Sequence, residues 1–168
     1  MAIFQEKELT LDYYLMRDGG IAIYHHAQVI DKDVEWLESH GYNIEQFDCT
    51  NWKTEKDMLN VLARKLGFPQ SSQSNLDGLN DYLSDIDVPE NGGLVLVFRR
   101  YDVFNASHPS IAWQILDVFS TQSRFFLLFG KHLMVLIQSD DPNIKFNPVG
   151  SCPMQWNSKE WMNQKRGV

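Results

Sequence analysis

A run of five consecutive apolar residues, Leu94-Val95-Leu96-Val97-Phe98, constrains the fold more than any other feature of the chain. Successive side chains of a β-strand point to opposite faces, so a strand that is apolar at every position needs cover on both faces. A second run, Leu133-Met134-Val135-Leu136-Ile137, has the same character. The two runs predict an α/β fold in which helices pack against a small parallel β-sheet of three to four strands.

Shorter signals suggest the other elements. We expect two further strands, over residues 21–24 and 42–48. Helical spacing, with caps at Asp31 and Thr54 and stops at Gly41 and Gly67, predicts helices over 31–40 and 54–66. Later helices are expected over 76–86 and from Pro109 onward.

Two segments carry less decisive signals. Residues 99–108 are interpreted as a long connection. Residues 124–138 allow either the end of a helix followed by a strand or a β-hairpin, and the apolar run at 133–137 favours helix then strand.

The length of 168 residues fits a single domain. Within it we distinguish an N-terminal extension with a strand and a helix (1–41), a core (42–138) and an extended C-terminal tail (139–168). Pro142, Pro148 and Pro153 punctuate the tail, and Trp156 and Trp161 are expected to anchor it on the domain.

The charge of the chain narrows the classes of partner. The formal net charge is −7, which argues against direct binding of nucleic acid and permits a basic protein partner. Cys49 and Cys152 lie far apart and suit a reducing compartment. Neither a signal peptide nor a stretch long enough to span a bilayer is evident, so a cytoplasmic location with no membrane contact is expected.

The segment 76–86 has two chemically different faces when it is wound as a helix, with a cap at Ser74 or Asn75. Each residue advances about 100° around a helix axis. One sector collects the apolar residues Leu76, Leu79, Leu83 and Ile86. The opposite side collects Asp77, Asp81 and Asp85, with Asn80 and Ser84 beside them.

This acidic stripe lacks neighbouring cations, because no Lys or Arg occurs between Lys65 and Arg99. Like charges at this spacing repel, and a cationic partner would relieve that repulsion. The alternative interpretation is an ordinary solvent-exposed helix face, which is common among surface helices.

Three segments together resemble the barstar family, whose members are intracellular inhibitors of barnase-type ribonucleases. They are Phe68-Pro69, residues 75–83 (Asn-Leu-Asp-Gly-Leu-Asn-Asp-Tyr-Leu) and residues 93–99 (Gly-Leu-Val-Leu-Val-Phe-Arg). The family pattern P-x-Y-Y-G-x-N-L-D-A-L-W-D-x-L matches at Pro69, Asn75, Leu76, Asp77, Leu79, Asp81 and Leu83. The likeness covers roughly residues 42–138 and is typical of a longer bacterial variant.

The resemblance implies that this protein is not an enzyme and acts as an inhibitor or immunity protein. In the family, a loop and the following helix insert into the ribonuclease active site. Carried over, Asp77 and Asp81 are the expected inhibitory carboxylates, Asp81 the central one, and Asn75 caps the helix. The supporting partner-binding residues are expected to be Asn80, Asp85, Ser72 and Gln73. The expected partner is a basic protein such as a secreted ribonuclease or toxin.

The chain departs from the family pattern at the loop and on the helix. Ser71-Ser72-Gln73 replaces the family's Tyr-Tyr-Gly, and Asn80 replaces its helix Trp. Aromatic residues of this kind are usual anchors at interfaces. The identity of the partner and the oligomeric state are therefore left open.

Two other functions compete with the inhibitor. One is a small hydrolase that uses Asp48, Cys49 and Asp140 at predicted strand ends. The other is a barstar-like module that has lost inhibition and self-associates through Trp156, Trp161 or the N-terminal extension. We expect no metal, because His25-His26 on a strand would point to opposite faces. We expect no cofactor, because the glycine pairs Gly19-Gly20 and Gly92-Gly93 lie in neither a GxGxxG nor a Walker pattern.

Overall fold

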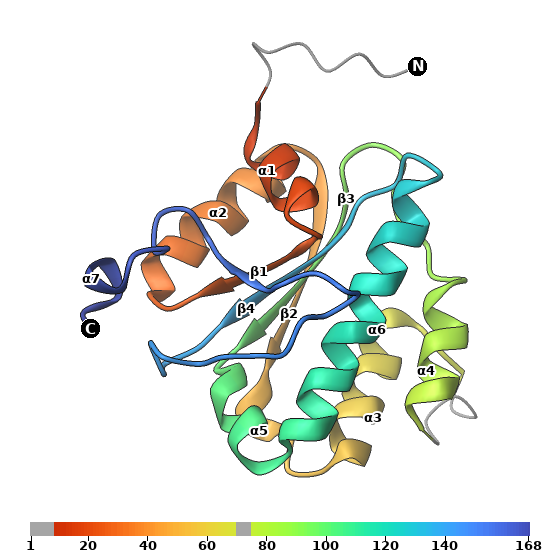
Figure 1. The fold of residues 1–168 in the computed structure, drawn as a ribbon. Helices are drawn as coiled ribbons and strands as arrows, with labels where there is room; N and C mark the ends of the chain where they lie inside the picture. Colours follow the sequence, from red (N-terminus) through yellow and green to blue (C-terminus); the bar gives the residue numbers. More distant parts are fainter. Residues whose placement is uncertain (1–8, 70–74) are drawn as a thin grey trace.

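The computed structural model describes residues 9–69 and 75–168, and its centre is one parallel sheet with helices on both faces (Figure 1). The sheet has the order β2-β3-β4-β1-β5, and every neighbouring pair is parallel. The strands are β1 (Ile21–Tyr24), β2 (Tyr42–Asp48), β3 (Gly93–Arg99), β4 (Leu133–Gln138) and β5 (Gln155–Trp156). The α/β class and the parallel sheet are confirmed.

The sheet has five strands, one more than the upper limit we predicted. The additional strand is β5, which comes from the tail and pairs with β1 through Ala22↔Gln155 and Ile23↔Trp156. A strand of two residues leaves no periodicity to detect, so its sequence carries no signal.

Helices cover the two faces of the sheet unequally. They are α1 (Leu11–Arg17), α2 (Ala27–Ser39), α3 (Glu55–Leu66), α4 (Leu76–Leu83), α5 (Tyr101–Ser107), α6 (Pro109–Leu127) and α7 (Asn163–Arg166), with a short 3₁₀ turn, η1, over Cys49–Asn51. In Figure 1, α1 and α2 lie on one side of the sheet, whereas α3, α4 and α6 lie on the other. Over residues 9–69 and 75–168, none of the helices is both long and apolar enough to cross a membrane.

The two apolar runs build both halves of the core. Alternate residues of β3 belong to different clusters: Leu94, Leu96 and Phe98 pack with α3, α4 and α6, while Val95 and Val97 pack with α2. All five are buried. This alternation is the reason why every position of the strand is apolar.

Several local signals act as the sequence predicts. The Thr54 hydroxyl accepts a hydrogen bond from the Asp57 backbone N–H at 3.1 Å and caps α3. Gly67 ends that helix in the left-handed conformation, with φ of 74°. The segment 124–138 is the end of α6 followed by β4, so the preferred alternative is confirmed and the hairpin is excluded.

Two helix predictions were wrong. The helix expected over 31–40 begins at Ala27, so Asp31 lies inside α2 and pairs with Arg99 at 2.7 Å instead of capping the helix. The long connection expected over 99–108 contains α5, which begins directly after Arg100, a residue held in the left-handed region with φ of 54°.

Only one of the two tryptophans that were expected to anchor the tail, Trp156, does so, and Arg166 adds polar contacts. Trp156 lies in β5, and the Arg166 guanidinium stacks 4.1 Å from the centre of its ring. Arg166 also donates to the carbonyls of Pro142 and Glu160. Trp161 is 67% exposed, so its predicted role as an anchor was wrong.

Candidate partner-binding surface on α4

The sequence around α4 fixes where the helix starts and which face it buries. The Asn75 side-chain oxygen accepts a hydrogen bond from the Gly78 backbone N–H at 2.8 Å, so Asn75, rather than Ser74, is the cap. Leu76, Leu79 and Leu83 are buried against the rest of the core. These contacts hold α4 in one orientation, which fixes the direction of its outer face.

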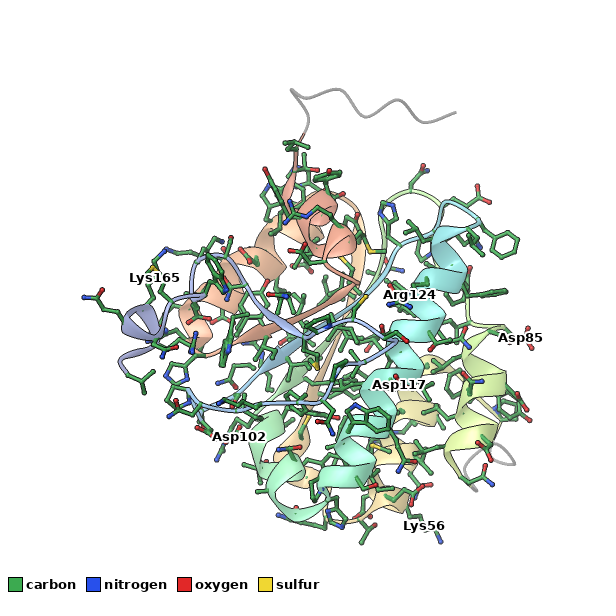
Figure 2. All side chains as sticks on the ribbon, viewed as in Figure 1. Lys56, Asp85, Asp102, Asp117, Arg124 and Lys165 are labelled. Carbon is green, nitrogen blue, oxygen red and sulfur yellow. The ribbon has the colours of Figure 1, made fainter. Side chains whose placement is uncertain are left out.

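The aspartates that were singled out in the sequence lie on that outer side. Asp77, Asp81 and Asp85 are all exposed. Asp77 occupies the first turn, where the helix dipole favours a negative charge. Asp85 lies two residues beyond the helix end, because α4 stops at Leu83 rather than at Ile86. Figure 2 shows Asp85 pointing away from the body of the protein.

The acidic surface is not neutralised within the part of the chain that the structure describes. No Lys or Arg in the described ranges lies within ion-pair distance of Asp77, Asp81 or Asp85. Figure 1 also places α7 and the C-terminus on the opposite side of the molecule from α4. With respect to residues 9–69 and 75–168, all three carboxylates stay exposed to solvent.

Asn80 lies at the border of the acidic stripe, where it lines one hollow with Asp77, and its side chain also contacts α6. Its side-chain oxygen accepts a hydrogen bond from Gln122 Nε2 of α6 at 2.9 Å, and the residue is half-buried. Asn80 is only about 40° around the axis from Leu76, so it turns toward α6. Ser72 and Gln73, the two predicted loop residues, lie outside the described residues.

A hollow of about 300 Å³ between α4 and α6 borders the acidic stripe. Its lining residues are Leu76, Asp77, Asn80, Gln114, Asp117, Val118 and Thr121. Five of these seven residues are polar, two of them are carboxylates, and none is a cation. Such a surface suits a cationic group on an apolar stem.

Sequence reasoning missed Asp117, which lies on α6 across the hollow from Asp77. Its carboxylate accepts a hydrogen bond from the Gly150 backbone N–H at 2.6 Å, and Trp113 Nε1 donates to the Pro148 carbonyl at 3.1 Å. The tail thus braces this side of α6 (Figure 2). Helical periodicity could have placed Asp117 on an outer face of α6, but it could not have paired that face with α4.

The residues of the hydrolase hypothesis have other partners. Burial raises the pKa of the Cys49 thiol well above its ordinary value, and the Asp48 and Asp102 carboxylates raise it further. A thiol held in this state is a poor nucleophile. Asp48 accepts from the hydroxyl and the backbone N–H of Thr50, while Asp140 pairs with Arg100 at 3.4 Å.

The histidine pair is engaged within the protein. Our argument that the two rings point to opposite faces was wrong, because β1 ends at Tyr24 and the rings meet edge to face at 4.6 Å. Nδ1 of His25 lies 2.9 Å from the Ser139 carbonyl, and Nδ1 of His26 contacts Glu160. Among the described residues, no group of three His, Cys, Asp or Glu side chains is placed to hold a metal ion.

Comparison with known proteins places these features in a family. A comparison with curated protein sequences gives no match. The family model described as Barstar (barnase inhibitor) matches residues 42–138, which span β2 to β4 and include the whole of α4. This match covers more than half of the chain, and the chain therefore belongs to the barstar (barnase inhibitor) family.

Proposed function

We propose that this protein is an inhibitor that blocks the basic active site of a ribonuclease or related toxin with the outer face of α4. The observation that carries the proposal is the exposure of Asp77 and Asp81 on a rigidly docked helix, without a cation of the described chain beside them. The family assignment supports it, since the family is that of the barnase inhibitor.

The proposed mechanism is occlusion without chemistry. A nuclease active site collects Arg, Lys and His around the phosphates of its substrate. Two carboxylates held on one helix can accept charge-assisted hydrogen bonds from those groups, and the body of the protein then excludes the substrate. Because Asn75 and the buried leucines already fix α4, little conformational entropy is lost when the complex forms.

The overall charge favours such a partner. With a net charge of −7, the protein attracts a basic protein from a distance and speeds encounter, and it repels free nucleic acid. In this proposal Asp81 is the central contact, Asp77 and Asp85 extend the acidic surface, and Ser72 and Gln73 are further contacts with the partner. The protein acts in the cytoplasm of a bacterium that makes the toxin, as its immunity protein.

The proposal is tested by affinity capture from the source organism with purified protein and two charge-matched variants. The double variant Asp77→Ala/Asp81→Ala removes the proposed contacts. Glu35→Ala/Glu38→Ala removes the same charge from exposed positions of α2, on the other side of the sheet. A small basic ribonuclease that copurifies with the wild type and the α2 variant, and not with the α4 variant, supports the proposal. Equal capture by both variants contradicts it.

A second candidate function is self-association through the tail. Trp161 is 67% exposed and Met162 is 58% exposed, and large neighbouring apolar side chains are unusual on a free surface. Sedimentation of the wild type and of Trp161→Ser/Met162→Ser tests this function. A concentration-dependent dimer that the substitutions abolish would favour it, and a monomer at all concentrations would exclude it.

A further inference from the structure

A hollow of about 290 Å³ lies on the other side of the sheet from α4, between α1, β1, α2 and the segment that follows β5. Every one of its lining residues falls outside 42–138, so the hollow belongs to the N-terminal extension and the tail rather than to the part that matches the family. The two appended segments thus form a concave site that the family match does not account for.

The walls of this hollow are mostly apolar. Leu11 and Leu15 come from α1, Ala22 from β1 and Trp156 from β5. Leu15 and Ala22 are 7% and 6% exposed, so the floor belongs to the core. A volume near 300 Å³ is at the lower end for small-molecule sites and fits one aromatic ring with a short substituent.

One end of the hollow is polar and tightly organised. Asp33 of α2 is 3% exposed and accepts a hydrogen bond from the Tyr24 hydroxyl at 2.8 Å. Its other oxygen receives the ammonium group of Lys159, which reaches in from the tail. Both oxygens of this buried carboxylate have donors, so Asp33 serves to position Lys159.

Two cations and two carboxylates line the hollow, paired as Lys159 with Asp33 and Arg17 with Asp18, and each cation keeps N–H groups beyond those it gives its partner. The Lys159 ammonium has three N–H groups and gives one to Asp33, and the side chain remains 53% exposed. Arg17, also 53% exposed, binds Asp18 through Nε and Nη2 at 2.8 and 3.2 Å, and its guanidinium has five N–H groups in all. Both cations line the same hollow.

We propose that this hollow binds a small aromatic carboxylate. The ring lies among Leu11, Leu15, Ala22 and Trp156, and the carboxylate accepts hydrogen bonds from Lys159. A cationic ligand fits less well, because each carboxylate of the hollow is already paired, so the ligand would have to displace Lys159 from Asp33 or Arg17 from Asp18. A neutral ligand would gain the apolar contacts without the charge-assisted bonds.

The test uses the full chain and three probes that share one ring and differ in the head group: phenylacetate, 2-phenylethanol and phenethylamine. Binding is followed by NMR at the Trp156 indole N–H. We expect saturable binding of phenylacetate, at least about tenfold tighter than that of the other two probes, since a charge-assisted hydrogen bond accounts for such a factor. Equal affinities, or no saturation by about 10 mM phenylacetate, would overturn the proposal.

Variants locate the binding and control for misfolding. Lys159→Met/Asp33→Asn removes both charges of this ion pair together, so that the buried Asp33 position is not left with an unpaired charge. It should lose the preference for phenylacetate over 2-phenylethanol, whereas Lys159→Arg and the tail control Lys165→Met should retain it. If Lys159→Arg folds but binds all three probes alike, or if Lys165→Met also loses the preference, the assignment to Lys159 is wrong.

Discussion

The Glu160 carboxylate accepts a hydrogen bond from the backbone N–H of His26 at 2.8 Å, although the two residues are 134 positions apart. It also accepts one from the His25 N–H at 2.8 Å and one from Asn157 Nδ2 at 2.8 Å, and it is 2% exposed. His26 is the N-cap of α2. The tail therefore satisfies the start of a helix in the N-terminal extension, and the two appended segments depend on each other.

We expect Glu160→Gln to destabilise the fold by about 1–3 kcal/mol, because an amide cannot accept from all of these donors and leaves buried N–H groups without partners. Urea unfolding followed by circular dichroism measures the change. Glu35→Gln, at an exposed site on α2, is the control and should shift stability by less than about 0.5 kcal/mol. Equal effects would mean that Glu160 does not hold the tail.

The same contact predicts a loss of stability in acid. Burial alone would raise the pKa of Glu160, but the hydrogen bonds from His25, His26 and Asn157 outweigh it and lower the pKa below its ordinary value. A carboxyl whose pKa is lowered by folding stabilises the protein above its unfolded pKa, and this stabilisation is lost as the pH falls through the folded pKa.

We define the stability gap as the difference in free energy of unfolding between the wild type and Glu160→Gln. This gap should be constant near pH 6 and should shrink below about pH 4. The gap is measured by urea unfolding in a His26→Gln background, which removes the contact of the imidazole ring with the carboxyl. A gap that persists unchanged to about pH 3 would show that Glu160 does not titrate in this way.

Gly92 and Gly130 both have left-handed backbone, with φ of 85° and 72°, and differ in their surroundings. A Cβ at Gly92 would overlap the backbone of Gly41, whereas nothing lies within 4 Å of a Cβ at Gly130. We expect Gly130→Ala to cost about 1 kcal/mol from backbone strain and Gly92→Ala clearly more, since two loops would have to separate. Thermal unfolding compares the two variants, and equal melting temperatures would contradict the prediction.

Asn75→Ala should loosen the start of α4. The loss of a side-chain cap costs about 1 kcal/mol, and Asn75→Asp, which can still accept from Gly78, should cost much less. Amide hydrogen exchange in α4 measures the effect locally. Faster exchange in both variants would mean that the hydrogen bond to Gly78 does not set the helix start.

The features that sequence predicts well are those set within a few residues. The apolar runs at 94–98 and 133–137, the Thr54 cap and the Asn75 cap all depend on neighbours along the chain, and each is found where it was expected. The exposure of Asp77 and Asp81 also follows from helix geometry alone. The contact of Asn80 with Gln122 was not predicted, because it joins two helices that are far apart in sequence.

The features that sequence does not predict depend on distant contacts. The start of α2 rests on Glu160 of the tail, and β5 exists because Gln155 and Trp156 meet β1. The hollow beside α4 is lined by Asp77 of α4 and by Asp117 of α6, two residues that only the packing of the two helices brings together. None of these pairings leaves a pattern in the local sequence, so a structure is needed to find them.

The most direct test of the proposed function is inhibition of the captured ribonuclease by wild-type protein, Asp81→Ala and Glu35→Ala, with residual RNA cleavage measured against inhibitor concentration. We expect wild type and Glu35→Ala to inhibit equally, and Asp81→Ala to be weakened at least about thirtyfold through faster dissociation, because a buried cation of the nuclease would lose its partner. Inhibition by Asp81→Ala that equals the wild type would contradict the central role of α4.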